Sequence, residues 1–69
     1  MKKLILIGGG GHCKSCINTI EKIEGVVIEG ILDVPERIGD TVLGYPIVGT
    51  DDQFAEWVET EHEFLITIG

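Results

Sequence analysis

The chain has 69 residues, of which 43% are hydrophobic, and its 5 Lys and Arg against 12 Asp and Glu give a net charge of −7. This length allows one domain, and a mean hydropathy of +0.27 excludes an intrinsically disordered chain. The acidic balance repels polyanions and so excludes nucleic acid as a partner, although backbone N–H groups can still bind a small phosphorylated ligand locally.

A strand is predicted over Lys3–Ile7, where consecutive large aliphatic residues indicate burial on both faces of a sheet. The apolar run stops at Gly8, which is too early for a targeting or membrane-spanning segment. We therefore expect a cytoplasmic protein with no membrane partner.

Four glycines, Gly8 to Gly11, connect this strand to a predicted helix. The helix has an apolar stripe at three- and four-residue spacing that should pack on the sheet. The stripe consists of Cys13, Cys16, Ile17, Ile20 and Ile23. Gly25 is placed to end the helix as a C-cap glycine.

A second strand is predicted over Val26–Leu32, with Asp33 at its carboxyl end. Strand, helix and strand form a βαβ unit, so the first two strands should be parallel neighbours. The segment from Val34 to Gly49 is rich in glycine and proline and is predicted as a loop. Within it we expect Tyr45–Val48 to form a short edge strand, where a proline is tolerated.

Thr50 and Gln53 fit a capping box, which predicts a helix from Asp51 onward. Its inner, core-facing residues are expected to be Phe54, Trp57 and Val58. The last predicted strand is Phe64–Ile68. The chain stops where a further strand-end loop would begin, which predicts a fragment of a longer protein.

Together these elements predict an α/β fold, a small Rossmann-like three-layer domain over residues 1–69. Its parallel sheet of three to four strands should have the spatial order 3-2-1-4 and be flanked by two helices. The last strand is expected to pair with the first, and Tyr45–Val48 to lie at one edge.

The glycines approximate a dinucleotide-binding fingerprint, Gly8-x-Gly10-x-x-Cys13, with cysteine in place of the third glycine or alanine. Such a turn binds phosphate through its bare backbone and the unpaired N–H groups of the following helix. Asp33 lies where a carboxylate can accept hydrogen bonds from a ribose, and His12 at the helix start can contact a ligand. The predicted nucleotide-binding residues are Gly8, Gly9, Gly10, Gly11, His12 and Asp33. The alternatives are a tight structural turn for the glycines, and helix capping or simple exposure for His12.

Cys13 and Cys16 are expected to be reduced thiols that pack in the core. A thioredoxin-like redox pair is a weaker alternative. A zinc site that adds His12 and His62 is weaker still, because adjacent His12 and Cys13 point apart. We therefore expect no metal.

The chain resembles the N-terminal domain of sugar O-acyltransferases of the sialic acid O-acetyltransferase type (NeuD/PglD-like). The resemblance rests on the glycine run with His12, the pair Leu32-Asp33, the segment Gly39-Asp-Thr-Val-Leu-Gly-Tyr-Pro-Ile-Val-Gly49 and the final Ile66-Thr-Ile-Gly69. It covers the whole chain, with two departures. Cys13 replaces the usual alanine or glycine, and Val34 replaces a common second acidic or amide residue.

The resemblance implies a domain that binds a UDP- or CMP-linked sugar within an acetyl-CoA-dependent sugar O- or N-acetyltransferase. In that family a following left-handed β-helix forms a homotrimer, binds acetyl-CoA and carries the catalytic histidine. The 69 residues contain no such repeats, so we expect this chain to bind substrate without catalytic residues or a cofactor of its own. The rival interpretations are an NAD-binding half-domain of an oxidoreductase and a stand-alone ligand-binding module.

Overall fold

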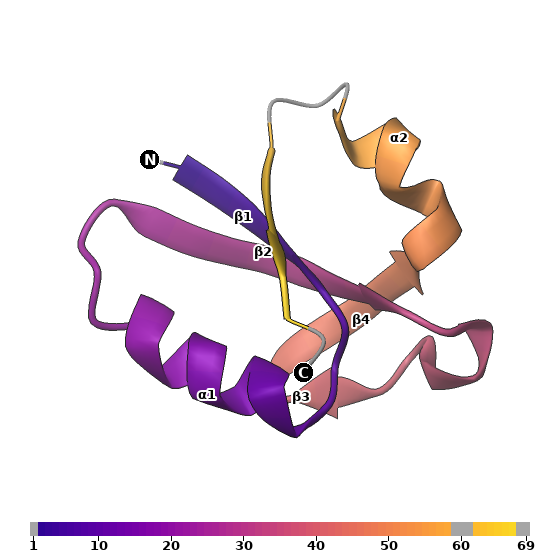
Figure 1. Ribbon diagram of the computed structural model, residues 1–69, viewed down its shortest axis with the longest axis horizontal. Coiled ribbons are helices and arrows are strands. Elements are labelled where there is room, and N and C mark those ends of the chain that lie inside the picture. Colours follow the sequence, from indigo (N-terminus) through magenta and orange to yellow (C-terminus); the bar gives the residue numbers. More distant parts are fainter. Residues whose placement is uncertain (1, 59–61, 68–69) are drawn as a thin grey trace.

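The computed structural model describes residues 2–58 and 62–67. At its centre is a five-stranded sheet in the order β3-β4-β2-β1-β5 (Figure 1). The strands are β1 (Lys2–Ile7), β2 (Val26–Asp33), β3 (Thr41–Val42), β4 (Tyr45–Thr50) and β5 (Glu63–Ile66). The helices are α1 (Gly11–Ile20) and α2 (Phe54–Val58), with short 3₁₀ turns η1 (Pro35–Arg37) and η2 (Asp51–Gln53). Among the described residues, no helix is long and apolar enough to cross a membrane.

The sheet confirms the predicted small α/β, Rossmann-like fold. Strand β1 pairs in parallel with both β2 and β5, and β2 pairs in parallel with β4. The prediction of three to four strands in the order 3-2-1-4 is wrong in its strand count, because β3 is a fifth strand beyond β4. It pairs antiparallel with β4 and takes the edge position that was expected for Tyr45–Val48.

The β3–β4 hairpin is closed by Leu43 and Gly44, which have φ values of 50° and 89°. Positive φ at both central residues is the geometry of a type I′ turn, which suits the right-handed twist of a two-strand hairpin. A strand of two residues is too short to produce an alternating hydrophobic pattern, so the sequence analysis predicted a loop at Thr41–Val42. Leu43 is an unusual residue for this position, because residues that carry a Cβ rarely adopt positive φ.

Helix α1 covers one face of the sheet. Its buried residues Cys13, Ile17 and Ile20 form one core cluster with apolar side chains of the strands. Those strand residues are Leu6, Ile28, Ile31, Val42 and Ile47. Burial of the predicted stripe is thereby confirmed at Cys13, Ile17 and Ile20, while Cys16 is half-buried and packs against the cluster.

Ile23 does not belong to this core, since its side chain is 51% exposed. The helix ends at Ile20, earlier than predicted. The backbone N–H groups of Lys22 and Ile23 donate to carbonyl groups three residues back, which tightens the last turn and rotates Ile23 off the stripe. Gly25, with φ of 83°, then leads into β2 rather than capping α1 directly.

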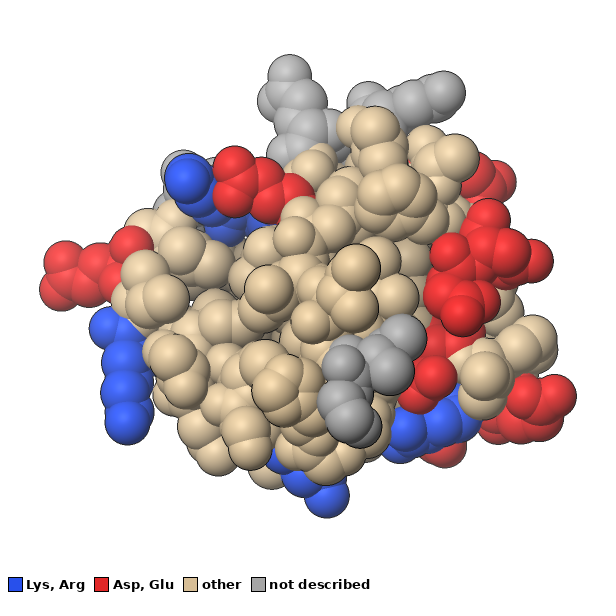
Figure 2. Space-filling model, viewed as in Figure 1, with Lys and Arg blue, Asp and Glu red and all other residues tan. Residues whose placement is uncertain are grey.

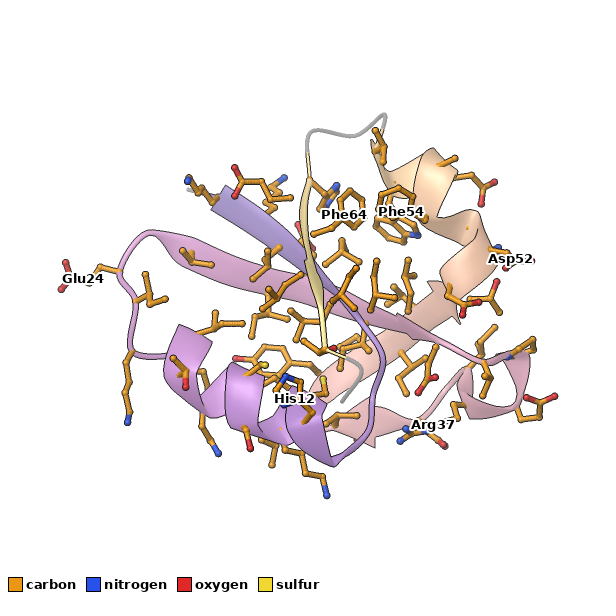
Figure 3. The ribbon with its side chains drawn as sticks, in the orientation of Figure 1. His12, Glu24, Arg37, Asp52, Phe54 and Phe64 are labelled. Carbon is orange, nitrogen blue, oxygen red and sulfur yellow. The ribbon has the colours of Figure 1, made fainter. Side chains whose placement is uncertain are left out.

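The opposite face of the sheet carries the fully buried side chains of Ile5 and Leu32. Strand alternation places them away from α1 and toward η2 and α2. Position 30 on this face requires glycine, because a Cβ there would lie 2.8 and 3.0 Å from the methyl carbons of Val48. Figure 3 shows the rings of Phe54 and Phe64 together, with centroids 4.4 Å apart.

The predicted capping box forms, and the Thr50 backbone N–H donates to Gln53 Oε1 at 2.9 Å. The turn it starts is 3₁₀, and α2 proper begins at Phe54. The expectation that Phe54 and Val58 are core is wrong, since they are 40% and 49% exposed. Because α2 has only five residues, it covers too little of the sheet to bury these two side chains. The predicted strand end at Ile68 lies outside the described residues.

Candidate functional site

A depression of about 300 Å³ lies at the carboxyl ends of β1 and β2, beside the start of α1. It is lined by Gly9, Gly10, Gly11, His12, Asp33, Arg37 and Thr67. The fold thus brings Asp33 to the glycine loop, as the sequence predicted. Gly8 is buried beneath the depression rather than lining it. Arg37 and Thr67 are lining residues that the sequence analysis missed.

Gly8 turns the chain off the sheet. Its φ is 107°, a conformation that favours glycine, and its N–H donates to Leu32 O at 2.8 Å. The buried Thr67 hydroxyl lies 2.5 Å from Gly8 O and 3.0 Å from Ile7 O, so its proton serves two carbonyl groups. This contact holds the end of β1 to the segment that follows β5.

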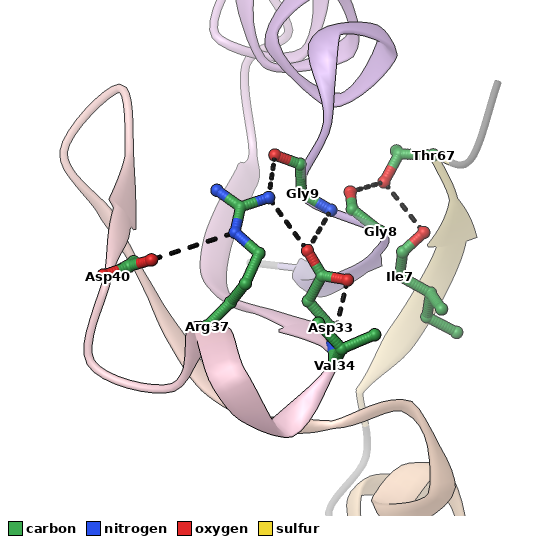
Figure 4. A network of polar contacts seen from close by, with 8 residues as sticks. All are labelled: Ile7, Gly8, Gly9, Asp33, Val34, Arg37, Asp40 and Thr67. Atoms are coloured by element: carbon green, nitrogen blue, oxygen red, sulfur yellow. Dashed lines mark hydrogen bonds and ion pairs between the residues drawn. The ribbon is translucent and has the colours of Figure 1, made fainter.

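Both backbone polar groups of Gly9 are held by side chains, one from the last residue of β2 and one from η1 (Figure 4). Its N–H donates to Asp33 Oδ2 at 3.1 Å, and its carbonyl accepts from Arg37 Nη1 at 2.7 Å. A Cβ at this position would lie 2.9 Å from Asp33 Oδ2 and 3.1 Å from Arg37 Nη1. Glycine is required here because the acid and the guanidinium approach the bare backbone.

Asp33 and Arg37 also contact each other, with Nη1 3.0 Å from Oδ2. The second carboxylate oxygen, Oδ1, accepts from the Val34 N–H at 2.8 Å. The Asp33 side chain is 18% exposed and the Arg37 side chain 35%. Oδ2 therefore accepts two hydrogen bonds, from Gly9 and Arg37, whereas Oδ1 accepts one and keeps a further lone pair for a ligand hydroxyl.

Gly10 and Gly11 differ from Gly8 and Gly9 in one respect. A Cβ built on either would meet no atom of the described residues within 4 Å, and neither residue has positive φ. The structure of the chain itself gives no reason for glycine at these two positions. The glycines instead leave an open strip of backbone along the floor of the depression.

The backbone N–H groups at the start of α1 face no acceptor among the residues that the structure describes. The helical hydrogen bonds begin with Cys13 and Lys14, whose N–H groups lie 3.1 and 3.4 Å from Gly10 O. Within residues 2–58 and 62–67, no hydrogen bond is donated by the N–H of Gly10, Gly11 or His12. Three donors and the positive end of the helix dipole are therefore available to an anion.

The His12 side chain is exposed and lines the same depression (Figure 3). It does not cap α1, whose N-cap residue is Gly10. His62 is distant in the fold, since it precedes β5 at the opposite end of the sheet and its ring packs edge-on against Trp57. The two histidines therefore do not form one site.

Cys13 is fully buried in the core cluster, and Cys16 is half-buried. Burial raises the pKa of the Cys13 thiol, although a hydrogen bond with Thr67 acts in the opposite direction. Cys13 packs in the core as predicted, and Cys16 packs against the core cluster from a half-buried position. Among the described residues, no three His, Cys, Asp or Glu side chains are grouped to hold a metal ion.

The model of the PglD N-terminal domain family matches residues 3–69. The chain belongs to this family. A PglD N-terminal domain is part of sugar acetyltransferase family proteins, which agrees with the resemblance read from the glycine run and Asp33. A search of curated proteins gave no match to the chain.

In this PglD N-terminal domain, the hydrophobic periodicity of the sequence could not predict that Arg37 and Thr67 line the depression. Arg37 lies 28 positions from Gly9 and Thr67 lies 59 positions from Gly8, so only the folded chain brings each pair together. A weak signal did exist for both. A threonine inside the apolar final strand must find a hydrogen-bond partner, and an arginine four residues after Asp33 can reach it from a helical turn.

Proposed function

We propose that this PglD N-terminal domain binds the nucleotide-linked sugar, a UDP- or CMP-sugar, for an acetyl-CoA-dependent sugar O- or N-acetyltransferase. The observation that carries the proposal is the pair Gly10 and Gly11, which no contact within residues 2–58 and 62–67 requires to be glycine. A ligand that lies on the backbone accounts for both. The N–H groups beside them, which have no acceptor among the described residues, support an anionic ligand.

In this proposal the phosphate groups accept hydrogen bonds from the N–H groups of Gly10, Gly11 and His12. A hydroxyl of the ribose or sugar donates to the remaining lone pair on Asp33 Oδ1. The network around Gly9 fixes Asp33 before the ligand arrives, so less conformational entropy is lost on binding. The His12 ring, exposed at the rim, supplies a further polar contact.

The domain is proposed to bind without catalysing. Acyl transfer requires a general base within hydrogen-bond reach of the attacking hydroxyl or amine, and a site for the acyl donor. His12 lies beside the groups proposed for phosphate, and His62 lies at the far end of the sheet. We assign acetyl-CoA binding, the catalytic histidine and homotrimer formation to the left-handed β-helix of the parent enzyme.

Titration calorimetry with UDP-N-acetylglucosamine, CMP-sialic acid and NAD tests the proposal. We expect a nucleotide-sugar to bind and NAD to bind more weakly. Gly10→Val places a branched side chain over the open backbone and should lower the affinity at least about tenfold, while Asp33→Ala should cost about 1–3 kcal/mol of binding. Asn18→Val, which adds the same side chain to the exposed face of α1, serves as the control.

Two outcomes would contradict the proposal. Unchanged nucleotide-sugar affinity in both Gly10→Val and Asp33→Ala would show that the ligand does not lie on the glycine loop. A clear preference for NAD would favour the dehydrogenase half-domain instead.

A further inference from the structure

A second depression, of about 300 Å³, lies between β4 and α2. It is lined by Val48, Gln53, Glu56 and Trp57. The last three are spaced at i, i+3 and i+4 along the helical segment that runs from η2 into α2, so they share one face of it. Val48 closes the depression from the sheet and is 38% exposed, while the Trp57 side chain is half-buried. The fold therefore leaves an aliphatic and an aromatic surface open beside a carboxylate.

The segment that borders this depression is acidic and has no positive charge of its own. Figure 2 shows acidic side chains gathered over the side of the molecule that carries η1, η2 and α2. Between residues 51 and 58 the chain has three carboxylates, Asp51, Asp52 and Glu56, and no Lys or Arg. Within residues 2–58 and 62–67, none of the three forms an ion pair. Asp52 and Glu56 are four positions apart on the helical segment, where like charges repel. A cation bound here relieves that repulsion.

Trp57 adds a contact that favours one class of cation. Its indole packs edge-on against the His62 ring at a centroid distance of 5.3 Å, which restricts its orientation. Gln53 is also held in place, because its Oε1 accepts from the Thr50 N–H in the capping box. An arginine guanidinium stacks on an aromatic face and pairs with a carboxylate through its planar edge, whereas a lysine ammonium is a point charge. An indole beside Glu56 therefore favours arginine.

We propose that the depression between β4 and α2 binds an arginine side chain from a basic segment of a partner protein. The guanidinium lies on the indole of Trp57 and pairs with Glu56, and the aliphatic stem of the arginine packs on Val48. Charge complementarity selects this partner. Nucleic acid and anionic membranes are repelled by the acidic segment, and so is the same face of a second copy, since each chain has a net charge of −7. This docking site is independent of the proposed function, because it shares no lining residue with the depression at the glycine loop.

Trp57 is the one tryptophan of the chain, so its fluorescence reports directly on this depression. The probes are blocked peptides in which glycine alternates with arginine, with lysine or with glutamate, titrated at physiological salt. The arginine peptide should change the Trp57 emission saturably. The lysine peptide should bind at least about threefold more weakly, because an ammonium lacks the planar surface that stacks on indole. The glutamate peptide should not bind.

Glu56→Gln keeps the size of the side chain and removes its charge. It should weaken binding of the arginine peptide about threefold or more, as for a partly exposed ion pair. Glu24→Gln is the matched control, because it removes the same charge from an exposed residue, and Figure 3 shows Glu24 and Asp52 on opposite sides of the molecule. Since salt screens exposed charges beyond about 8 Å, Glu24→Gln should bind the peptide within about 1.5-fold of wild type.

Trp57→Leu, measured by titration calorimetry, removes the aromatic face and should abolish the preference for arginine over lysine. Three results would overturn the proposal. An emission that the arginine peptide leaves unchanged would show that it does not bind. Equal affinities for the arginine and lysine peptides, with equal effects of Glu56→Gln and Glu24→Gln, would show general charge attraction. An emission that changes with protein concentration in the absence of peptide would assign the depression to a second copy of the chain.

Discussion

Gly9 and Asp33 are joined by a hydrogen bond of 3.1 Å from the glycine N–H to Oδ2, although they lie 24 positions apart in the chain. The bond ties the loop after β1 to the end of β2. The carboxylate therefore has a structural task in addition to the proposed contact with a ligand. The position of the carboxylate also explains why Gly9 cannot carry a side chain. Gly10 and Gly11, where a Cβ would meet no described atom, could carry one.

Gly9→Ala should destabilise the domain by about 1–2 kcal/mol, because the added Cβ displaces the Asp33 carboxylate and breaks its hydrogen bonds. Gly11→Ala is the matched control. It adds the same methyl group in open space on the first turn of α1, so it should stabilise by about 0.4–1 kcal/mol through lower unfolded-state entropy. Urea denaturation measures both. Equal effects of the two substitutions would show that the Gly9–Asp33 contact does not constrain the loop.

Leu43→Asn should stabilise the domain by about 0.5–1 kcal/mol. Asparagine tolerates positive φ, and Asn-Gly is a preferred pair for a type I′ turn. Leu43 is half exposed, so its removal creates no cavity. Leu43→Ala keeps the unfavourable backbone conformation and should show no comparable gain in the midpoint of denaturation. A gain of the same size in both variants would assign the effect to the lost apolar surface.

The two cysteines should differ in reactivity. Cys13 is fully buried with a raised thiol pKa, so it should resist iodoacetamide at pH 8 in the folded protein. Cys16 is half-buried and should be alkylated faster, by about tenfold or more. Mass spectrometry of the digested protein over time separates the two sites. Faster modification of Cys13 than of Cys16 would contradict the burial that the fold assigns.

Tyr45 provides a pH-dependent contribution to stability. Its hydroxyl donates to Glu21 Oε2 at 2.8 Å, and this hydrogen bond is the main cause of its raised pKa, with smaller contributions from burial and from the Glu21 charge. A raised pKa in the folded state means that the stabilisation is complete below the ordinary value of 10.0 and is lost as pH rises through the folded-state pKa.

Tyr45→Phe should therefore cost about 0.5 kcal/mol at pH 8, as for an exposed hydrogen bond, and progressively less above about pH 10. Glu21→Gln is the control, because it keeps a hydrogen-bond acceptor but removes the charge. A difference between wild type and Tyr45→Phe that stays constant from pH 8 to pH 11 would argue against the Tyr45–Glu21 contact.

Much of the fold followed from local patterns. The apolar runs predicted β1, β2 and β5 as parallel strands, and the capping box at Thr50 predicted the second helical segment. The βαβ order also placed Asp33 near the glycine loop, because carboxyl ends of neighbouring parallel strands meet at one edge of a sheet.

The parts that were missed depend on distant contacts or on very short elements. Strand β3 exists because Leu43 and Gly44 turn the chain back, and two residues leave no periodic signal. Arg37 joins the site only because η1 folds it back over Gly9. Ile23 matched the helical spacing but lost its place in the core when the last turn tightened, a change that depends on hydrogen bonds rather than on spacing.

The central claim is that a nucleotide-linked sugar lies on the glycine loop, and chemical-shift mapping of backbone amides during titration with UDP-N-acetylglucosamine tests it most directly. We predict that the largest shifts occur at Gly10, Gly11 and His12, whose N–H groups have no acceptor in the described part of the chain. The depression between β4 and α2, lined by Val48, Gln53, Glu56 and Trp57, should remain unperturbed. Shifts centred on that second depression, or none at saturating nucleotide-sugar, would contradict the account.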